Sequence, residues 1–248
     1  MWETVWQLTG HAAAVRLKEF HAAVDLARPG DGLTEVLVAG RRLAGARLLG
    51  IAAPAIAGAD NGRPSECFVR GPDLAVAYEE SGQWPVCVDA VWRTTAPTPA
   101  DNFLAAVDLI VSVRTPLLDS HPELVVQSVV PSGEVLRLLP AADWAALAAP
   151  ATVAPPSGAG CLLFRIPDSD LTYVEMVHPA DFQHDELGWD ASGGDMLCLA
   201  HRLFGANLEK GVILRARVRG VFLARQGDMA AAAQCYAAFA AADPPLGT

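Results

Sequence analysis

The chain has 248 residues, with 18 Lys and Arg against 28 Asp and Glu, which gives a formal charge of -10 at pH 7. A protein that coats nucleic acid or an anionic membrane needs a positive surface, so we expect neither partner. Hydrophobic residues make up 52% of the sequence and charged residues 19%. This composition predicts a globular protein with a sizeable core and argues against a disordered chain.

Signals for export, membrane insertion and metal binding are weak. The opening residues have no basic stretch before an apolar run, and the longest apolar stretch, 48–59, is broken by Gly50, Pro54 and Gly58. That stretch is shorter than the ~20 residues of a spanning helix, so we expect a cytoplasmic protein with no membrane passage. The five cysteines are odd in number and none has CxxC spacing, which argues against a disulfide framework and a zinc cluster.

Short apolar runs separated by Gly, Pro, Asp and Asn recur along the chain and predict strands. The expected strands are 22–27, 34–38, 47–51, 67–70, 74–79, 86–94, 107–115, 124–130, 134–138, 159–166, 173–177, 196–204 and 212–223. Runs at such short intervals predict a mainly β protein, a large antiparallel β-sandwich formed by one domain over residues 1–248. Residues 140–147 could form a short helix, and 148–160 could be a linker between two strand-rich halves or a crossover within one sandwich.

One convincing helix is expected at the end of the chain. Asp228 is placed to cap it, and apolar residues then recur at helical spacing on a single face, namely Met229, Ala232, Ala233, Tyr236, Phe239 and Ala240. This face should pack on a sheet, and Pro244 and Pro245 should end the helix.

The run 212–225 alternates as a half-buried strand does. Arg215, Arg217 and Arg219 fall on one face, and the apolar residues between them fall on the other. Three guanidinium groups spaced by ~7 Å, two strand rises of ~3.4 Å, could hold an anion such as a sugar phosphate. The plainer interpretation is a ladder paired with carboxylates of a neighbouring strand. Whether the ladder faces a ligand stays open.

The residues that most suggest catalysis lie in the segment 171–182. A carboxylate inside an apolar strand is costly to bury unless it is paired or its pKa rises, and a raised pKa suits a general acid or base. Glu175 fits this description and is a candidate catalytic residue. His178, on the opposite face by strict alternation, is the second candidate. The alternatives are a Glu on the solvent face of an edge strand and a structural His.

Aromatic and cationic residues of the first half form a candidate substrate-binding set. Trp92 and Trp84 could stack on a sugar ring, and Arg70 and Arg93 could hold its hydroxyls or a phosphate. Arg63, in a loop of turn-forming and charged residues, is a further binding candidate. The alternative places these residues in the core and at its rim.

His184, Asp185 and Glu186, with Asp181 and Asp190, form an acidic cluster. It lacks a spaced second histidine, so we interpret it as a solvated loop and expect no metal. The sequence has no GxSxG, no Walker lysine motif, no GxGxxG after a strand and no HExxH. Hydrolase, nucleotide-binding and protease classes lose support, and no cofactor is expected.

Three stretches, 22–50, 173–179 and 208–215, resemble the galactose mutarotase-like (aldose epimerase) family in their glycine turns, late glutamate strand and final strands. The resemblance implies a β supersandwich in which Glu175 removes the proton of the anomeric hydroxyl. In that family, histidines from the middle of the chain act opposite the glutamate, and here the matching region 107–130 offers only His121. His178 or Arg70 would then have to polarise the ring oxygen.

Two functions therefore remain open. The first is a carbohydrate-binding protein with a sugar or sugar phosphate as partner, either non-catalytic or a divergent aldose epimerase. The second is a structural or assembly protein without a small-molecule substrate, in which the arginines and the acidic loop make subunit contacts. An unpaired base performs poorly, which favours binding over full catalysis.

Overall fold

The computed structural model describes residues 5–53, 63–80, 84–98, 101–131, 133–191 and 195–243. The expected helix stop at Pro244 and Pro245 and part of the loop before Arg63 lie outside the described residues. Within these ranges the chain forms two antiparallel sheets, a short 3-10 turn η1 (Pro29–Asp31) and one α-helix.

The first sheet has ten strands in its described part. They are β1 (Trp6–Thr9), β2 (Ala12–Arg16), β3 (Phe20–Asp25), β4 (Leu33–Val38), β5 (Arg41–Arg42), β6 (Arg47–Ala52), β11 (Leu124–Pro131), β14 (Ala151–Val153), β17 (His184–Trp189) and β18 (Met196–Leu203). Their order is β1-β2-β3-β4-β6-β11-β18-β17-β14, with β5 paired to β4.

The second sheet has nine strands in its described part. They are β7 (Glu66–Arg70), β8 (Asp73–Tyr78), β9 (Cys87–Thr95), β10 (Ala105–Arg114), β12 (Glu134–Leu138), β13 (Trp144–Ala146), β15 (Cys161–Arg165), β16 (Leu171–Val177) and β19 (Ile213–Ala224). Their order is β13-β12-β15-β16-β19-β10-β9-β8-β7. Strands β10 and β19, far apart in sequence, pair along their length, as do β11 and β18. The mainly β, antiparallel class expected from the sequence is confirmed.

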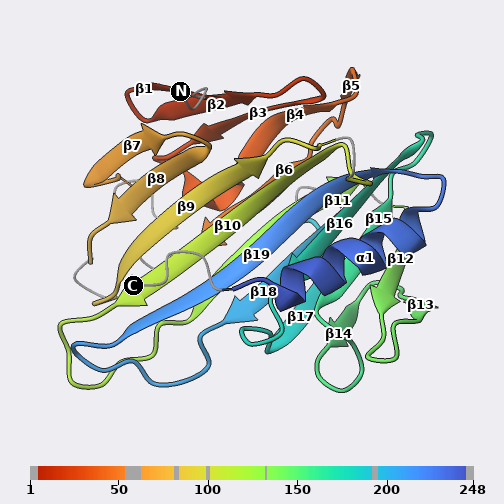
Figure 1. Ribbon diagram of the computed structural model, residues 1–248. Coiled ribbons are helices and arrows are strands. Elements are labelled where there is room, and N and C mark those ends of the chain that lie inside the picture. Colours follow the sequence, from red (N-terminus) through yellow and green to blue (C-terminus); the bar gives the residue numbers. More distant parts are fainter. Residues whose placement is uncertain are drawn as a thin grey trace.

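The two sheets pack against each other (Figure 1). Their facing side chains form the main core. Alternation along each strand sends apolar residues into this layer. On β9, Trp92 is fully buried and donates its indole N–H to the carbonyl of Leu49 on β6 at 3.2 Å. Phe20 of β3 and Tyr173 of β16 both pack on Phe222 of β19, with ring centroids 5.7 and 5.0 Å from it. The aromatic contacts thus tie one sheet to the other.

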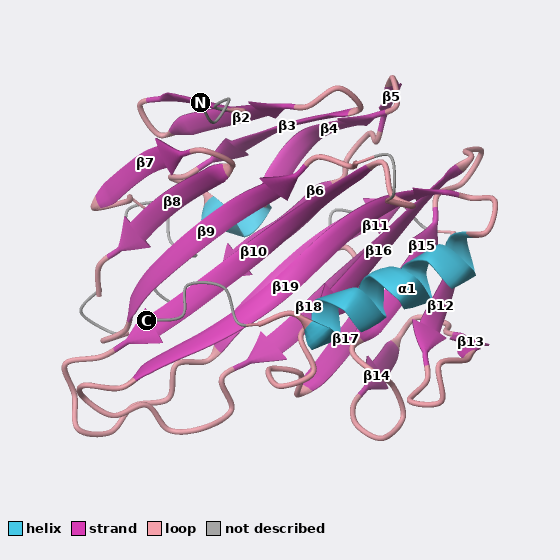
Figure 2. Cartoon of the chain, viewed as in Figure 1, coloured by secondary structure: helices cyan, strands magenta, loops and turns pink. Residues whose placement is uncertain are grey.

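Helix α1 (Asp228–Ala241) packs on the face of the nine-stranded sheet that is turned away from the other sheet, called here the outer face (Figure 2). The helix contacts β15, β16 and β19. Its buried apolar residues, Ala232 and Phe239, belong to a second core with Val174 and Met176 of β16. The expected terminal helix is confirmed, although Met229 is partly exposed and does not belong to the packed face.

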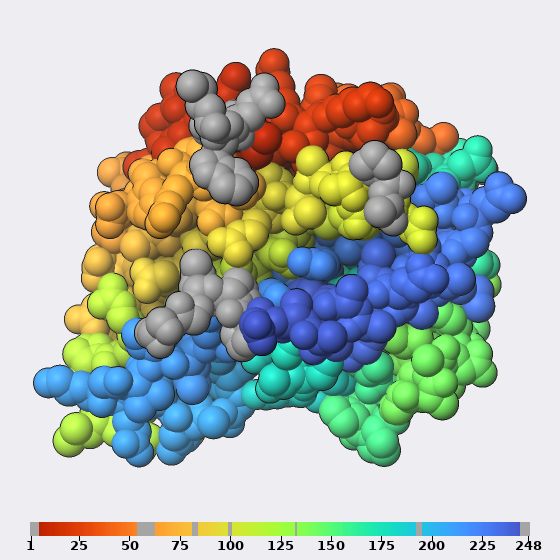
Figure 3. Space-filling model, in the orientation of Figure 1, coloured from red at the N-terminus to blue at the C-terminus, as the bar shows by residue number. Residues whose placement is uncertain are grey.

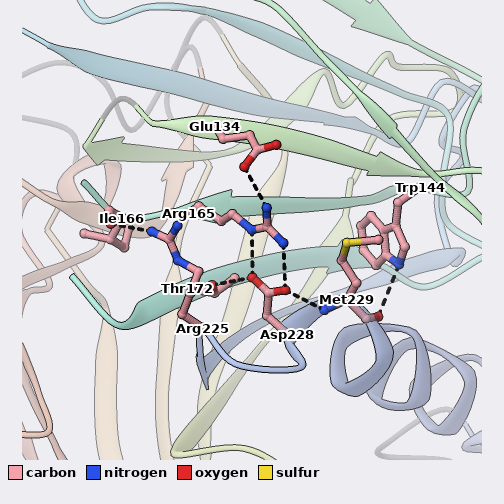
Figure 4. A network of polar contacts seen from close by, with 8 residues as sticks. All are labelled: Glu134, Trp144, Arg165, Ile166, Thr172, Arg225, Asp228 and Met229. Atoms are coloured by element: carbon pink, nitrogen blue, oxygen red, sulfur yellow. Dashed lines mark hydrogen bonds and ion pairs between the residues drawn. The ribbon is translucent and has the colours of Figure 1, made fainter. Parts of the chain in front are cut away.

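The start of α1 is fixed by a polar network around Asp228 (Figure 4). Both Asp228 oxygens accept bonds from Arg165 at 2.9 and 3.0 Å, and Thr172 donates to one of them at 2.9 Å. Arg165 also binds Glu134 at 2.7 Å, and Trp144 donates to the carbonyl of Met229. Asp228 is the first helical residue and not the cap, which is Gly227 in a left-handed conformation.

The prediction of a short helix at 140–147 was wrong. After a turn in which Ala142 has a positive φ, residues Trp144–Ala146 form β13 and pair with Leu136–Leu138 of β12. Pairing with the sheet edge overrides the helix propensity of this alanine-rich run. Among the described residues, no helix combines the length and the apolar character needed to cross a bilayer.

Candidate functional site

Glu175 lies near the middle of β16, a strand with neighbours on both sides. Its side chain points into the layer between the sheets, on the same face as Tyr173 and Val177. Its exposed fraction is 0%. The interpretation as a surface Glu on an edge strand was therefore wrong, and the reasoning that a buried carboxylate needs partners applies.

The partners of Glu175 come mostly from the other sheet. Ser128 of β11 donates to its Oε2 at 2.6 Å, and the Tyr173 hydroxyl donates to the same oxygen. The Nε2 of His201, on β18, lies 2.9 Å from Oε1. The other ring nitrogen of His201 lies 2.6 Å from Oδ1 of Asp185, on β17. A carboxylate, a histidine and a second carboxylate thus connect β16 with β18 and β17.

The charges of this cluster explain the state of His201. Burial alone lowers the pKa of an imidazole, but Asp185 and Glu175 outweigh burial and raise the pKa of His201 from 6.5 to about 10. His201 is therefore an imidazolium at neutral pH, and both of its N–H groups donate. The pKa of Tyr173 is raised by its burial and by the Glu175 charge, so the phenol stays a hydrogen-bond donor.

The buried cluster joins the two sheets but is closed to solvent, since Glu175, Asp185 and His201 all have 0% exposure. A sugar therefore has no contact with Glu175 in this conformation. The geometry suits a structural role, in which one cation is held by carboxylates from both sheets.

A second polar arrangement lies on the open outer face, where directly opposed residues of five adjacent strands form a row of alternating charge. The row is Arg70 of β7, Asp73 of β8, Arg93 of β9, Asp108 of β10 and Arg219 of β19. We call this the charged row. Five strands spaced by ~4.8 Å give it a length of roughly 19 Å.

Two pairs in the charged row are bidentate. Arg93 donates to the two Asp73 oxygens at 2.7 and 2.8 Å, and Arg219 donates to the two Asp108 oxygens at 2.7 and 2.8 Å. The Arg93 and Asp73 side chains are 30% and 18% exposed. Arg93 and Asp73 therefore present fixed donors and acceptors next to one another at the surface, whereas in the second pair Arg219 is partly exposed and Asp108 is buried.

A groove of about 360 Å³ lies beside the charged row, over β10 and β19 and between α1 and residues 95–98 and 101–103 (Figure 3). Arg219 belongs to both the row and the groove. The described lining is mixed, with hydroxyl, amide, thiol and carboxylate groups and apolar side chains, among them Thr95, Thr98, Asp101, Asn102, Phe103, Val221, Gln234, Cys235 and Ala238. A bond of 3.1 Å from the Asn102 amide to Gln234 links the two walls.

A larger pocket, about 440 Å³, lies at the other end of β10 and β19, where Glu79, Glu80, Arg114 and Lys210 line it. It contains no member of the charged row. The groove beside α1 is the better candidate because it adds convergent polar groups to the row.

The structure separates the residues that the sequence marked for binding and catalysis. Arg70 and Arg93 share the charged row. Trp92 is fully buried between the sheets, so its ring offers no surface to a sugar, and Trp84 is also buried. Arg63 is exposed, precedes β7 and is not a member of the charged row.

His178 follows β16 and lies on the outer face, opposite to Glu175 as alternation predicts. Its ring packs edge-on against Phe239 of α1, with centroids 5.7 Å apart. The two candidate catalytic residues therefore face different layers and do not act on one substrate in this conformation.

The sequence interpretation missed three residues of the buried cluster, His201, Asp185 and Ser128. The prediction that Asp185 lies in a solvated loop is wrong, because His184–Trp189 is a strand with Asp185 on its buried face. The available signal was alternation, since His201 shares its parity with the buried Leu197, Leu199 and Leu203.

In the described part of the chain, no group of three or more His, Cys, Asp or Glu side chains is arranged to hold a metal ion. No protein-family model and no curated protein matches the sequence.

Solved structures match the chain over most of its length. The galactose mutarotase-like protein from Lactobacillus casei ATCC 334 has a TM-score of 0.58 at 9% identity, covering 84% of this chain and 99% of that one. The Slr1438 protein from Synechocystis sp. PCC 6803 has a TM-score of 0.58 at 12% identity, covering 90% and 96%. A candidate aldose 1-epimerase from Escherichia coli K12 has a TM-score of 0.54 at 11% identity, covering 90% and 99%. At these identities the similarity concerns the fold, and the chain has the galactose mutarotase-like β-sandwich fold.

Proposed function

We propose that the protein binds a carbohydrate on the outer face of the nine-stranded sheet, in the groove beside α1 and along the charged row. The observation that carries this proposal is the pair of bidentate contacts, Arg93 with Asp73 and Arg219 with Asp108, in a row that reaches a groove with hydroxyl and amide walls at Arg219. The names of two neighbours, a galactose mutarotase-like protein and a candidate aldose 1-epimerase, point to the same class of ligand.

The chemistry of the row matches a neutral polyhydroxylated ligand. A sugar hydroxyl both donates and accepts, so neighbouring hydroxyls can bind a carboxylate and a guanidinium side by side. Each guanidinium in the two bidentate pairs is already neutralised by a carboxylate, which reduces its attraction for a free anion. Phe103 and the alanines of the groove supply apolar surface for the ring carbons.

We further propose that this binding does not involve proton transfer by Glu175. Both Glu175 oxygens are bound by Ser128, Tyr173 and His201 inside the core. A general base must come within hydrogen-bond reach of the proton that it removes. The function is then that of a carbohydrate-binding relative of the epimerases.

Binding of neutral hexoses, followed by saturation-transfer NMR and calorimetry, tests the proposal. Arg93→Met removes one guanidinium of the row, and we expect the affinity to fall about tenfold, or about 1.4 kcal/mol. The matched control is Arg202→Met, because Arg202 also makes a two-bond contact with a carboxylate, Glu186, but on the other sheet. Equal effects of the two variants, or no binding of any sugar, would contradict the proposal.

Exchange between sugar anomers tests the second part. We expect the wild-type protein not to accelerate the exchange seen by NMR. Acceleration that disappears in a folded Glu175→Gln variant would show that Glu175 is a catalytic base and that a different conformation opens the core.

A further inference from the structure

Phe239, near the end of α1, is surrounded by cationic and protonatable groups of the outer face. Its side chain is fully buried. The guanidinium carbons of Arg217 and Arg219 lie 4.2 and 4.9 Å from the centroid of its ring. The ring of His178 approaches the same ring edge-on. The Phe239 ring thus fills a space that is lined by Arg217, Arg219 and His178.

The guanidinium of Arg217 makes few hydrogen bonds in this space. It is 6% exposed, and its Nη2 donates to the Phe239 carbonyl at 2.8 Å. Its Nε is buried and has no hydrogen-bond partner among the described residues, and the same holds for Nε2 of His178. Burial lowers the pKa of Arg217. A buried guanidinium that contacts a ring and a carbonyl but no carboxylate lacks its best partner.

The carboxylates nearby are committed to other groups. Asp108 uses both oxygens for Arg219. The Oδ2 of Asp181 accepts the backbone N–H of Arg217 at 3.0 Å, and burial raises the pKa of Asp181. In the described part of the chain, therefore, no carboxylate neutralises the Arg217 guanidinium by direct contact.

The buried ring of Phe239 lies next to the groove, in contact with Arg219, which lines it. Ala238 and Arg219 both line the groove, and Phe239 is the next residue on the helix and stacks on Arg219. Arg217 and His178 contact the same ring and do not line the groove. A ligand in the groove that carried a further substituent in this direction would meet the ring first.

We propose that Phe239 determines specificity by closing an anion subsite formed by Arg217 and His178 next to the groove. With the ring in place, the groove takes a neutral sugar. Without it, the unpaired Nε of Arg217 and Nε2 of His178 would hold a carboxylate or a phosphate group, as found in acidic sugars and sugar phosphates. The sugar part of this inference depends on the proposed function, whereas the anion part does not.

The test compares glucose with glucuronate, which differ by one carboxylate, on the full-length wild type and on Phe239→Ala. We expect the wild type to bind glucuronate no more tightly than glucose, and Phe239→Ala to bind glucuronate at least tenfold more tightly than glucose. Adding Arg217→Met to Phe239→Ala should abolish that preference. Met229→Ala, on the exposed side of the same helix, is the control and should behave as the wild type.

Inorganic phosphate separates this inference from the proposed function. At constant ionic strength, phosphate should raise the melting temperature of Phe239→Ala, but not that of the wild type or of the double variant. If phosphate has this effect and no sugar binds any variant, the subsite stands and the proposed function fails. If sugar binds the wild type and Phe239→Ala gains neither glucuronate nor phosphate binding, the subsite is overturned.

The loss of a buried ring can prevent folding, so a second variant is needed. Phe239→Val keeps an apolar contact under the helix but removes the ring. We expect the same gain for glucuronate and phosphate, with unchanged helix content by circular dichroism. If Phe239→Ala and Phe239→Val both fold and neither gains anion binding, or if the gain persists after Arg217→Met, the inference is wrong.

Discussion

The Oε1 of Glu175, on the nine-stranded sheet, lies 2.9 Å from Nε2 of His201, on the ten-stranded sheet. This is a charged contact between two sheets that meet mainly through apolar side chains. Asp185 on the far side of His201 makes the contact a three-residue chain. Glu175, the candidate catalytic residue of the sequence, thus lies in a buried contact between the sheets.

Glu175→Ala should destabilise the protein strongly. The substitution leaves the His201 imidazolium with one carboxylate and leaves Ser128 and Tyr173 without their acceptor, and breaking a buried ion pair costs about 3–5 kcal/mol. Urea unfolding followed by fluorescence measures the loss. The control Glu209→Ala removes an exposed carboxylate and should change the free energy of unfolding by less than about 0.5 kcal/mol. A similarly small loss of unfolding free energy for Glu175→Ala would contradict a structural role for Glu175.

Stability should also fall as the solution becomes alkaline. The pKa of His201 is raised in the folded state to about 10, from 6.5. A raised pKa stabilises the folded state fully below the unfolded value of about 6.5, and this contribution is lost as the pH rises towards 10. Urea midpoints measured between pH 6 and pH 10 should therefore decrease steadily. In a folded His201→Gln variant, the urea midpoint should depend clearly less on pH in this range. If the midpoint depends on pH as strongly as in the wild type, other groups cause the loss of stability.

Gly220 offers a test of the cluster that changes no charge. It lies opposite Glu175 in the β16–β19 register, and a Cβ placed on it would come 2.6 Å from the Tyr173 hydroxyl oxygen. Gly220→Ala should push Tyr173 away from Glu175 and reduce stability by about 1–3 kcal/mol.

The matched control for Gly220 is Gly188 on β17, where an added Cβ meets no atom within 4 Å. Gly188→Ala should be close to neutral in urea unfolding. Near-ultraviolet circular dichroism should change for Gly220→Ala only. Equal stability of the two variants would show that Tyr173 moves at no cost.

Local alternation predicted much of the fold. The run 212–225 placed Arg215, Arg217 and Arg219 on one face, and β19 has them there, with Val218 and Phe222 in the core. The plainer interpretation of the ladder holds for Arg219, which pairs with Asp108 on the neighbouring strand. It does not hold for Arg217, because α1 and Phe239 cover it. Packing of the helix on these arginines depends on tertiary structure and leaves no periodic signal.

The candidate site was harder to predict because its partners are distant in sequence. Glu175 and Ser128 are 47 residues apart, and Arg219 and Asp108 are 111 apart. Such contacts follow from the strand order of each sheet, which alternation does not reveal. For Trp92 the local signal was sufficient. Its size suggested a platform for a ligand, but its position in the strand assigns it to the core.

Asp228→Asn should loosen the start of α1 and with it one wall of the groove. Burial opposes ionisation of Asp228, but hydrogen bonds from Arg165 and Thr172 outweigh it and hold the pKa of Asp228 below its ordinary value. A lowered pKa stabilises the folded state above the unfolded value of about 3.9, and this contribution is lost as the pH falls below it. Asp228→Asn keeps the shape of the side chain but weakens both bonds to Arg165, at a cost of about 1–3 kcal/mol at pH 7.

Urea unfolding at pH 7 and pH 3 checks this expectation. The wild type should lose more stability than Asp228→Asn over that interval, because only the wild type has the carboxylate to protonate. Asp143→Asn is the control, since Asp143 is exposed and bonds only the adjacent backbone N–H among the described contacts of its side chain. If Asp228→Asn and Asp143→Asn are equally stable at pH 7, the network in Figure 4 does not hold the helix in place, and the wall of the groove depends on the apolar packing of Ala232 and Phe239.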